Sequence, residues 1–385
     1  MRWNILKKKM ICLLSYILVA TLASALTLGL TGREEQSKLD QLLDLAQQRY
    51  VDDVNRTELE DAAADAIVST LGDRWSYYIP AAEYADYMEQ MLNAYVGVGI
   101  TITVNEDGLG YDILSVEPRG PAQEAGILPG DILIAVEDQS VTEMTSTAVR
   151  NLVRGEEGTF VKLTVLRRTL EHSYRVERRE LETTVAEGLL LENGIGLVRI
   201  YNFDTRCAQE SIAAIKELLG KGATGIVFDV RNNGGGYAHE MVELLDFLLP
   251  EGELFRTVDF AGREAVDSSD KKHLDIPMAV LVNTESYSAA EFFAAALRDY
   301  DAAVIVGEQT SGKGYFQNTF KLNDGSAVAL STGKYFTPKG VSLEGVGITP
   351  DVPVELDEEQ AFQLYLKQLD PQEDPQLLAA VEAMK

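Results

Sequence analysis

The chain has 385 residues, of which 46% are hydrophobic and 25% are charged, and this composition indicates a folded protein rather than a disordered one. The length predicts more than one domain. The formal net charge of -27 at pH 7 argues against a nucleic-acid partner, because the phosphate backbone would be repelled.

The N-terminus, residues 1–33, has the pattern of a membrane-targeting segment. Arg2 and Lys7–Lys9 precede an apolar run, Met10–Leu30, that is long enough to cross a bilayer as a helix. We expect an uncleaved anchor in the cell membrane, which the chain crosses once and which leaves the bulk of the chain on the extracytoplasmic side. The alternative is a cleaved signal peptide of a secreted protein, with Ala23–Ala25 as the cleavage site.

Residues 34–92 have the pattern of a helical region. Apolar residues recur at helical spacing in the first part, and a second helix is expected over Thr57–Leu71. An aromatic turn, Trp75–Pro80, separates it from a third helix expected over Ala81–Leu92.

Cysteine and histidine are too rare to suggest a disulfide framework or a metal site. The two cysteines, Cys12 and Cys207, lie far apart in the chain, and only three histidines occur. No cluster of histidines or acids surrounds Cys207 in the sequence, so we expect no structural zinc. We expect no cofactor.

Residues 93–170 contain two glycine-rich motifs. The first is a G-x-G-hydrophobic segment made of Gly97, Val98, Gly99 and Ile100. The second runs from Gly120–Ala122 to Gly130–Leu133. Together they resemble a PDZ domain, in which a peptide tail extends a sheet edge and its carboxylate meets unpaired amide hydrogens. The resemblance implies protein or peptide substrates with free C-terminal tails.

Residues 171–355 have the order of elements of an α/β domain. The charged stretch Arg167–Glu182 alternates in sign and is expected to be a solvated connector. A strand at Ile195–Ile200, a helix at Ser211–Leu219 and a strand at Gly225–Val230 then predict a parallel sheet with helices packed on it.

A serine and a lysine in this domain lie in settings that suit chemistry. A strand at Met278–Val282 and a helix at Ala289–Tyr300 would place Ser288 at the turn between them. Amide hydrogens at a helix N-terminus stabilise a developing oxyanion. After a further strand, Ala303–Val306, Lys313 lies between two glycines. A buried lysine can be the base that a serine needs, because burial disfavours the ammonium form.

These residues resemble the C-terminal processing peptidases, the serine proteases of family S41. The likeness rests on Ser-x-x-Glu beginning at Ser288, on the G-E-x-T-x-G-K-G-x-x-Q segment around Lys313, and on the separation of 25 positions between them. It implies Ser288 as the nucleophile, Lys313 as the general base and Gln317 as the residue that orients the lysine. The family usually has S-A-S-A-S-E at the nucleophile, so Tyr287 and Ala290 are departures.

Glycines that follow the strand Gly225–Val230 are expected at the oxyanion site. The segment Asp229–Gly236 resembles the family's D-L-R-x-N-x-G-G segment. We expect an amide of Gly234 or Gly235, with the amide of Ala289, to bind the oxyanion, because no β-carbon would obstruct the substrate carbonyl. A phosphate-binding loop is the alternative, but neither G-x-x-x-x-G-K-[ST] nor G-x-G-x-x-G occurs there.

The expected fold is a multidomain protein of the α/β and β classes, with an N-terminal helical segment, a PDZ domain and an α/β catalytic domain of the crotonase- or ClpP-like kind. A C-terminal helical tail covers residues 356–385. The resemblance implies an extracytoplasmic serine endopeptidase and allows a homodimer. The alternatives are an inactive PDZ-bearing scaffold, an acyl-CoA enzyme of crotonase-like architecture, and a Ser-His enzyme that uses one of the three histidines, His172, His239 or His273.

Overall fold

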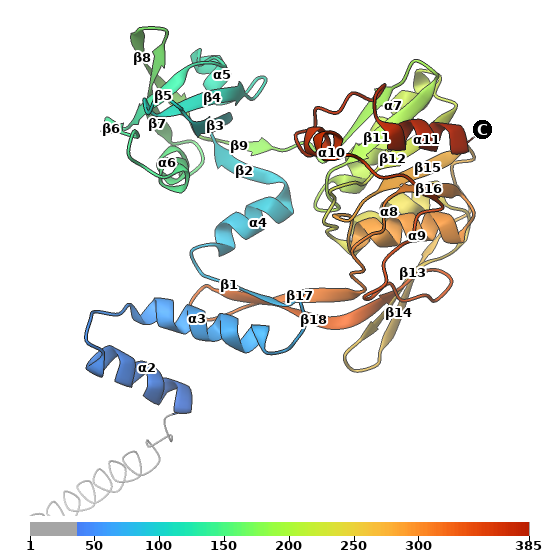
Figure 1. The fold of residues 1–385 in the computed structure, drawn as a ribbon, viewed down its shortest axis with the longest axis horizontal. Coiled ribbons are helices and arrows are strands. Elements are labelled where there is room, and N and C mark those ends of the chain that lie inside the picture. The colour runs from blue at the N-terminus through green and yellow to red at the C-terminus, as the bar shows by residue number, and fades with distance from the viewer. Residues whose placement is uncertain (1–36, 385) are drawn as a thin grey trace, which may run out of the picture. The chain divides into compact units, whose positions relative to one another are not determined.

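The computed structural model describes residues 37–384, and the chain divides into two compact units, before and after the Gly72–Asp73 bond. The first unit contains helices α2 (Lys38–Arg49) and α3 (Arg56–Ser69), drawn in blue in Figure 1. Each begins after a residue whose side chain accepts a hydrogen bond from an amide of the first turn, Ser37 for α2 and Asn55 for α3. The two helices confirm the expected helical N-terminal region.

The prediction of a single-pass membrane protein is corrected by the structure. No helix in residues 37–384 is long and apolar enough to span a bilayer. The longest helices described, α3 and α7 (Cys207–Gly220), have 14 residues each, whereas a span takes about 20 apolar residues. The run Met10–Leu30 on which the prediction was based, with the competing cleavage site Ala23–Ala25, lies outside the described residues.

The PDZ-like part of the chain is a small antiparallel sheet with two short helices. The strands follow the order β3-β4-β5-β7-β8, with β6 paired to β5. Their bounds are β3 (Ile100–Val104), β4 (Tyr111–Val116), β5 (Ile132–Val136), β6 (Gln139–Ser140), β7 (Phe160–Arg167) and β8 (Leu170–Glu177), and the helices are α5 (Pro121–Ala125) and α6 (Ser146–Val153). Ile113, Leu133 and Leu163 are fully buried in its core. Strand β3 ends the sheet, so one of its edges is free to accept a further strand.

The charged stretch Arg167–Glu182 is not the solvated connector that was predicted. Strand β8 pairs with β7 along its whole length, and β9 (Arg179–Glu182) pairs with β2 (Ala94–Gly97) in a two-stranded ribbon. Val176 is buried in the core while charged neighbours face solvent. The alternating pattern of this stretch is therefore that of a strand with one buried face. The chain therefore enters and leaves the PDZ-like domain through one antiparallel ribbon.

The second α/β domain is built on a six-stranded sheet of order β10-β11-β12-β15-β16-β19. Its strands are β10 (Ala186–Leu190), β11 (Ile195–Ile200), β12 (Gly225–Asp229), β15 (Met278–Val282), β16 (Ala303–Gly307) and β19 (Val352–Pro353). Strands β11 to β19 are parallel and β10 is antiparallel. Every residue of β12 and β15 is buried, as expected for parallel strands covered on both faces.

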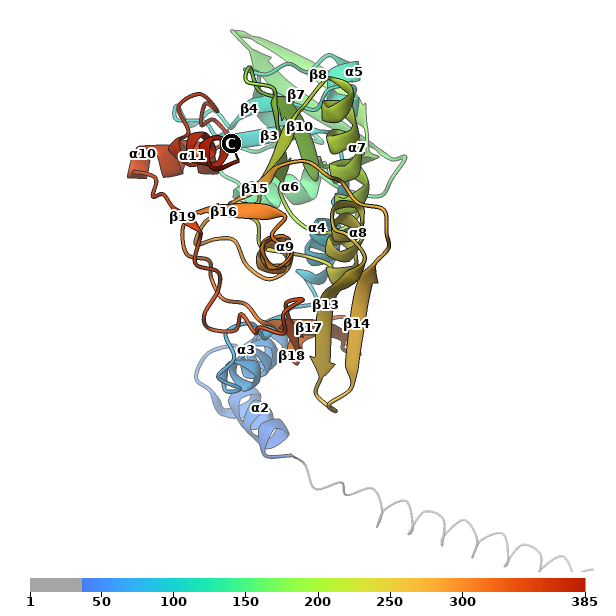
Figure 2. The same ribbon diagram turned by 90° about the vertical axis from the view of Figure 1, so that its right-hand side faces the viewer.

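Helices cover the two faces of this sheet (Figure 2). Helices α7, α8 (Ala238–Leu248) and α9 (Ala289–Asp299) pack on the face that carries Phe228 and Val280. The C-terminal helix α11 (Pro375–Ala383) packs on the opposite face, which carries Val227 and Ala279. The two clusters use alternate residues of the same strands, because successive side chains point to opposite faces.

A second antiparallel sheet includes the aromatic turn that the sequence placed among the N-terminal helices. Its strands are β1 (Tyr77–Ile79), β13 (Gly252–Asp259), β14 (Glu264–Ser269), β17 (Tyr315–Lys321) and β18 (Ala327–Phe336). Strand β1 pairs with β18. Helix α4 (Tyr84–Leu92) follows as the third helix of the sequence analysis, and helix α10 (Glu358–Tyr365) precedes α11. The pairing of β1 brings Asp73 and Trp75 to the lysine described below.

Candidate active site

Ser288 lies at a sharp turn between a buried strand and a helix. Strand β15 ends at Val282, and α9 begins at Ala289. The backbone of Ser288 has φ 59° and ψ -125°, which is strained for a residue with a β-carbon. Ser286 closes the turn, because its hydroxyl donates to Val230 O and accepts from Asn283 N. The turn therefore presents one serine, 6% exposed, at the N-terminus of a buried helix.

Lys313 lies in a partly buried aromatic setting. Its Nζ is 5.0 Å from the ring centroid of Trp75 and 5.7 Å from that of Tyr287. Burial lowers the pKa of Lys313 to about 8, against the opposing effect of the carboxylates of Asp73, Glu291 and Glu344. About a tenth of the amine is then free base at pH 7, far more than for an ordinary lysine, and the free base is the form that a general base requires.

One buried carboxylate connects the main chains of the serine and the lysine. Glu291 Oε2 accepts from Ser288 N at 3.0 Å and from Lys313 N at 2.8 Å. In the part of the chain that the structure describes, no hydrogen bond joins Ser288 Oγ to Lys313 Nζ. The structure thus brings the two residues into one region without a direct contact between their reactive atoms, a common state of sites without substrate.

Gln317 lies on β17, and no hydrogen bond between its side chain and that of Lys313 occurs among the described residues. Its Nε2 donates to Tyr315 O at 3.1 Å and to Ser331 Oγ at 2.9 Å. The amide of Ser331 in turn donates to Ser76 Oγ at 2.9 Å. The orienting role implied for Gln317 therefore stays a prediction.

The glycine-rich loop after β12 passes against the nucleophile turn. A β-carbon on Gly235 would lie 2.7 Å from Ser288 Cβ and 3.0 Å from Ala289 N, so only glycine permits this approach. The amide of Gly235 donates to Asn233 Oδ1 at 2.8 Å. The amides of Gly234 and Ala289 have no hydrogen-bond partner among residues 37–384. Of the predicted oxyanion donors, these two are the ones with free hydrogens.

Tyr287, a departure from the family pattern, forms an aromatic wall with Trp75. Their ring centroids are 5.7 Å apart, and the guanidinium of Arg74 lies 4.0 Å above the Trp75 ring. A β-carbon on Gly234 would lie 2.5 Å from the hydroxyl of Tyr287. The wall therefore reaches from the lysine to the glycine-rich loop. Sequence analysis missed Trp75 because its contact depends on the pairing of β1 with a distant strand.

The three histidines do not approach the nucleophile. His172 lies on β8 of the PDZ-like domain, the side chain of His239 is 73% exposed, and His273 contacts Lys271 O. No hydrogen bond of these histidines within the described residues reaches Ser288. The structure therefore gives no support to a Ser-His enzyme.

The predicted tail-binding loop of the PDZ-like domain has free amides. The carbonyls of Val98 and Gly99 accept from Ala122 N and Glu117 N, both at 2.9 Å. The amides of Val98 and Gly99 have no partner among the residues described. The loop leads directly into the edge strand β3, which begins at Ile100, so the geometry suits a carboxylate followed by an added strand.

A PDZ-like domain joined to a parallel-sheet domain that presents a strained serine defines a PDZ-bearing serine peptidase. Comparison with known proteins supports this class. Residues 194–354 match the family model of peptidase family S41, and residues 113–167 match that of the PDZ domain.

Curated relatives cover most of the chain. It is 30% identical over 366 residues to a probable CtpA-like serine protease of Staphylococcus saprophyticus, covering 92% of this chain and 73% of that protein. It is 31% identical over 360 residues to the carboxy-terminal processing protease CtpA of Bacillus subtilis, covering 88% and 76%. A putative S41 protease of Bacteroides fragilis has the same fold, with TM-score 0.54, 16% identity, and coverage of 89% and 96%. The chain belongs to peptidase family S41, among the carboxyl-terminal processing serine peptidases.

Proposed function

We propose that this peptidase is an endopeptidase that cleaves protein substrates with a Ser288–Lys313 dyad. The observation that carries the proposal is the strained turn that places Ser288 at the start of α9, with the amide of Lys313 bonded to the same carboxylate and the pKa of Lys313 lowered to about 8 by burial. A serine hydroxyl needs a base at neutral pH, and a desolvated lysine is one.

The chemistry follows from these positions. Ser288 Oγ attacks the scissile carbonyl carbon while its proton passes to Lys313 Nζ. The oxyanion accepts hydrogen bonds from the amides of Gly234 and Ala289. The C–N bond then breaks, Lys313 returns the proton to the leaving amine, and an ester on Ser288 remains. Water attacks this ester with Lys313 again as base, which releases the new C-terminal carboxylic acid and restores the serine.

Gln317 orients Lys313 in this proposal, which requires a rearrangement of the site. Its amide now donates to Tyr315 and Ser331. The missing hydrogen bond between Ser288 and Lys313 points to the same need. We therefore expect substrate binding to move Ser288, Lys313 and Gln317 into positions where they form hydrogen bonds with one another.

The PDZ domain supplies recognition of the substrate tail. The free amides of Val98 and Gly99 would bind the terminal carboxylate, with Gly97 and Ile100 flanking them, and the tail would extend the sheet at β3. Substrates are then proteins or peptides with accessible C-terminal tails. Pairing of two chains in a homodimer remains a prediction from the family resemblance.

The dyad is tested with single and double alanine variants. Ser288→Ala and Lys313→Ala should each lower kcat for a tailed reporter peptide by at least about a thousandfold, and the double variant should lose no more, because the two residues act as one unit. Circular dichroism and tail-peptide binding should be unchanged. His239→Ala serves as the control and should keep the rate. A Lys313→Ala variant that keeps most of its rate, or a His239→Ala variant that loses it, would refute the dyad.

A further inference from the structure

The carboxylate of Glu291 accepts four hydrogen bonds in the active site. Oε1 accepts from the hydroxyl of Thr310 and from Gly312 N at 2.8 Å. Oε2 accepts from Ser288 N at 3.0 Å and from Lys313 N at 2.8 Å. The residue is fully buried in the first turn of α9.

The four partners of this side chain favour its charged form. Three are backbone N–H groups, which can only donate, and the fourth is the Thr310 hydroxyl, which donates to Glu291 and accepts from Ile348 N at 2.7 Å. Burial raises the pKa of Glu291, and the four donors oppose that effect. Hydrogen bonds from four donors favour the carboxylate form and so act against the effect of burial.

The carboxylate connects two segments that carry the proposed reactive groups. Ser288 N belongs to the strained turn before α9, and Lys313 N belongs to the loop between β16 and β17. Both amides converge on one oxygen atom, so a shift of either segment breaks a charge-assisted hydrogen bond. Glu291 is the third residue after the N-cap Ser288, so its carboxylate also fixes the start of the helix.

We propose that Glu291 is the positioning residue that fixes the base relative to the nucleophile and whose charge favours the ammonium form of Lys313. The first effect keeps Lys313 within reach of Ser288 during attack. The second effect is electrostatic, because a negative charge close to an amine favours its protonated form. The proposal rests on the proposed dyad, and its test separates the two.

The test compares Glu291→Gln with Glu344→Gln. Glutamine removes the charge of residue 291 and turns one of its acceptors into a donor that faces backbone N–H groups. Glu344 also acts on Lys313 through its charge, and its Oε2 accepts from Gly314 N at 2.7 Å, but no hydrogen bond within the described residues joins it to Ser288. Comparison of the two variants therefore separates the loss of a negative charge near Lys313 from the loss of the hydrogen bonds that join the amides of Ser288 and Lys313.

Glu291→Gln should lower kcat by about a hundredfold with KM nearly unchanged, as expected for a small misplacement of reacting groups. The rise of kcat/KM with pH should move to lower pH, because Lys313 loses a negative neighbour and its pKa falls. Glu344→Gln should move the rise in the same direction but keep kcat within several-fold. Folding is monitored by thermal unfolding.

A Glu291→Gln variant with wild-type kcat would overturn the proposal. So would a rate that falls only in proportion to the folded fraction, with the pH dependence unmoved, since that is a purely structural effect. If Glu291→Gln does not fold, Thr310→Val withdraws one donor and keeps the charge. It should lower kcat several-fold, and an unchanged kcat would refute the proposal. Failure of the dyad itself would appear separately, as activity in Lys313→Ala.

Discussion

At the scale of the residue, the chemistry depends on which effect controls the protonation of Lys313. Three carboxylates, Asp73, Glu291 and Glu344, favour the ammonium, whereas burial opposes it and prevails, since the pKa is lowered to about 8. The free amine is the active form of a general base. Activity should therefore be low below this pKa and rise as the pH increases through about 8.

The reactive residues could be predicted from sequence because their identity and spacing carry the signal. Ser288 and Lys313 are 25 positions apart and lie in matched motifs. The surroundings that set their properties could not be predicted. The bond between Ser76 and Ser331 joins residues 255 positions apart, and the contact of Trp75 with the lysine depends on the same strand pairing. For Glu291, the Ser-x-x-Glu spacing of a capping box was the one available signal.

At the scale of the element, the C-terminal helix is joined to the end of β12 by buried charges. Arg231 Nη2 donates to Asp229 Oδ2 at 2.6 Å and to Asp374 Oδ2 at 2.7 Å, and Nη1 donates to Gln376 Oε1 at 2.8 Å. Asp374 also caps α11. A single guanidinium therefore joins two carboxylates from sequence positions far apart, next to the glycine-rich loop.

Arg231→Met should lower the free energy of unfolding by about 3–5 kcal/mol at pH 7, because two carboxylates remain buried without a cation. A buried carboxylate without a cation is costly only while it is charged, so the deficit should shrink as the pH falls toward the ordinary aspartate pKa of about 4. Urea unfolding of both proteins at neutral and mildly acidic pH measures this. Asp374→Asn keeps the helix cap and is the matched control, with a smaller loss. An Arg231→Met deficit that is small, or equal at both pH values, would contradict the argument.

At the scale of the element, one sequence pattern led to a wrong prediction. Alternating charge in Arg167–Glu182 suggested a solvated connector, yet the backbone pairs as β8 and β9. Charge alternation with period two fits both a loop and an exposed strand, and tertiary pairing decides between them. By contrast, the apolar runs of β12 and β15 fit only buried elements and were located correctly.

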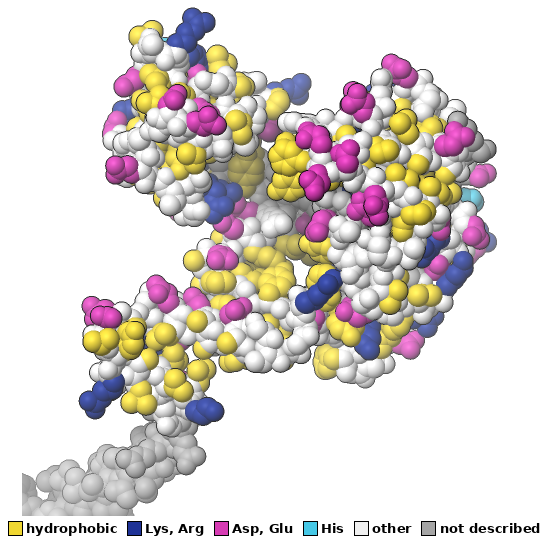
Figure 3. All heavy atoms as spheres, in the orientation of Figure 1, with side chains coloured by type: hydrophobic (Ala, Val, Ile, Leu, Met, Phe, Trp, Pro, Cys, Tyr) yellow, Lys and Arg dark blue, Asp and Glu magenta, His cyan; other side chains and the backbone are white. Residues whose placement is uncertain are grey.

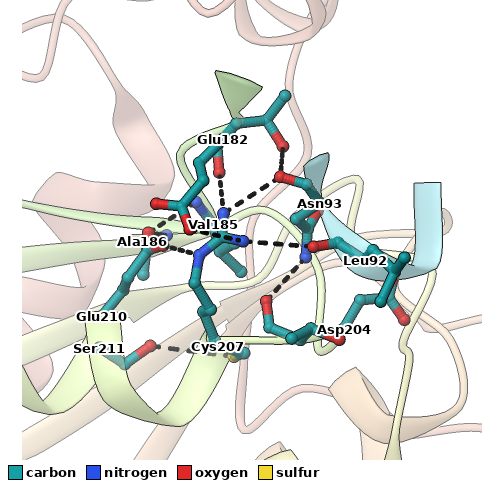
Figure 4. A network of polar contacts seen from close by, with 12 residues as sticks. Leu92, Asn93, Glu182, Val185, Ala186, Asp204, Cys207, Glu210 and Ser211 are labelled. Carbon is teal, nitrogen blue, oxygen red and sulfur yellow. Dashed lines mark hydrogen bonds and ion pairs between the residues drawn. The ribbon is translucent and has the colours of Figure 1, made fainter. Parts of the chain in front are cut away.

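At the scale of the whole molecule, the ribbon that leads to the PDZ domain is fastened to the catalytic domain. Arg206 Nη2 donates to Asn93 O at 3.1 Å and to Thr183 O at 2.8 Å, while its Nε donates to Glu210 Oε1 at 3.0 Å. Figure 4 shows this network around Asn93, Glu182 and Glu210.

Acidic side chains are spread over the visible face in Figure 3, in line with the net charge of -27.

The loop that carries Arg206 also contacts the glycine-rich loop. Phe203 N donates to Gly235 O at 2.7 Å, and Tyr237 N donates to Phe203 O at 2.8 Å. One short loop, residues 203–206, therefore has hydrogen bonds both to the ribbon of the PDZ domain and to the glycine-rich loop. On this basis we expect that tail binding changes the active site as well as delivering substrate.

Gating is tested with a short reporter peptide that lacks a PDZ-binding tail and a separate uncleavable tail peptide. If the bound tail favours the active arrangement, the tail peptide in trans should raise the rate of reporter cleavage several-fold, limited by its differential affinity for that arrangement. Passive tethering would give no change or simple competition at saturating tail peptide. Either of those outcomes would rule gating out.

The central claim is that Lys313 activates Ser288, and the pH dependence of serine acylation tests it most directly. The rate of covalent labelling by a fluorophosphonate would be measured from about pH 6 to about pH 10 in the wild type and in Lys313→Ala, with the labelled residue identified by mass spectrometry. We expect labelling of Ser288 that rises through about pH 8 in the wild type, and a slow rate without that rise in the variant. Labelling of another residue, or a Lys313→Ala variant with the wild-type rate and the same rise, would contradict the account.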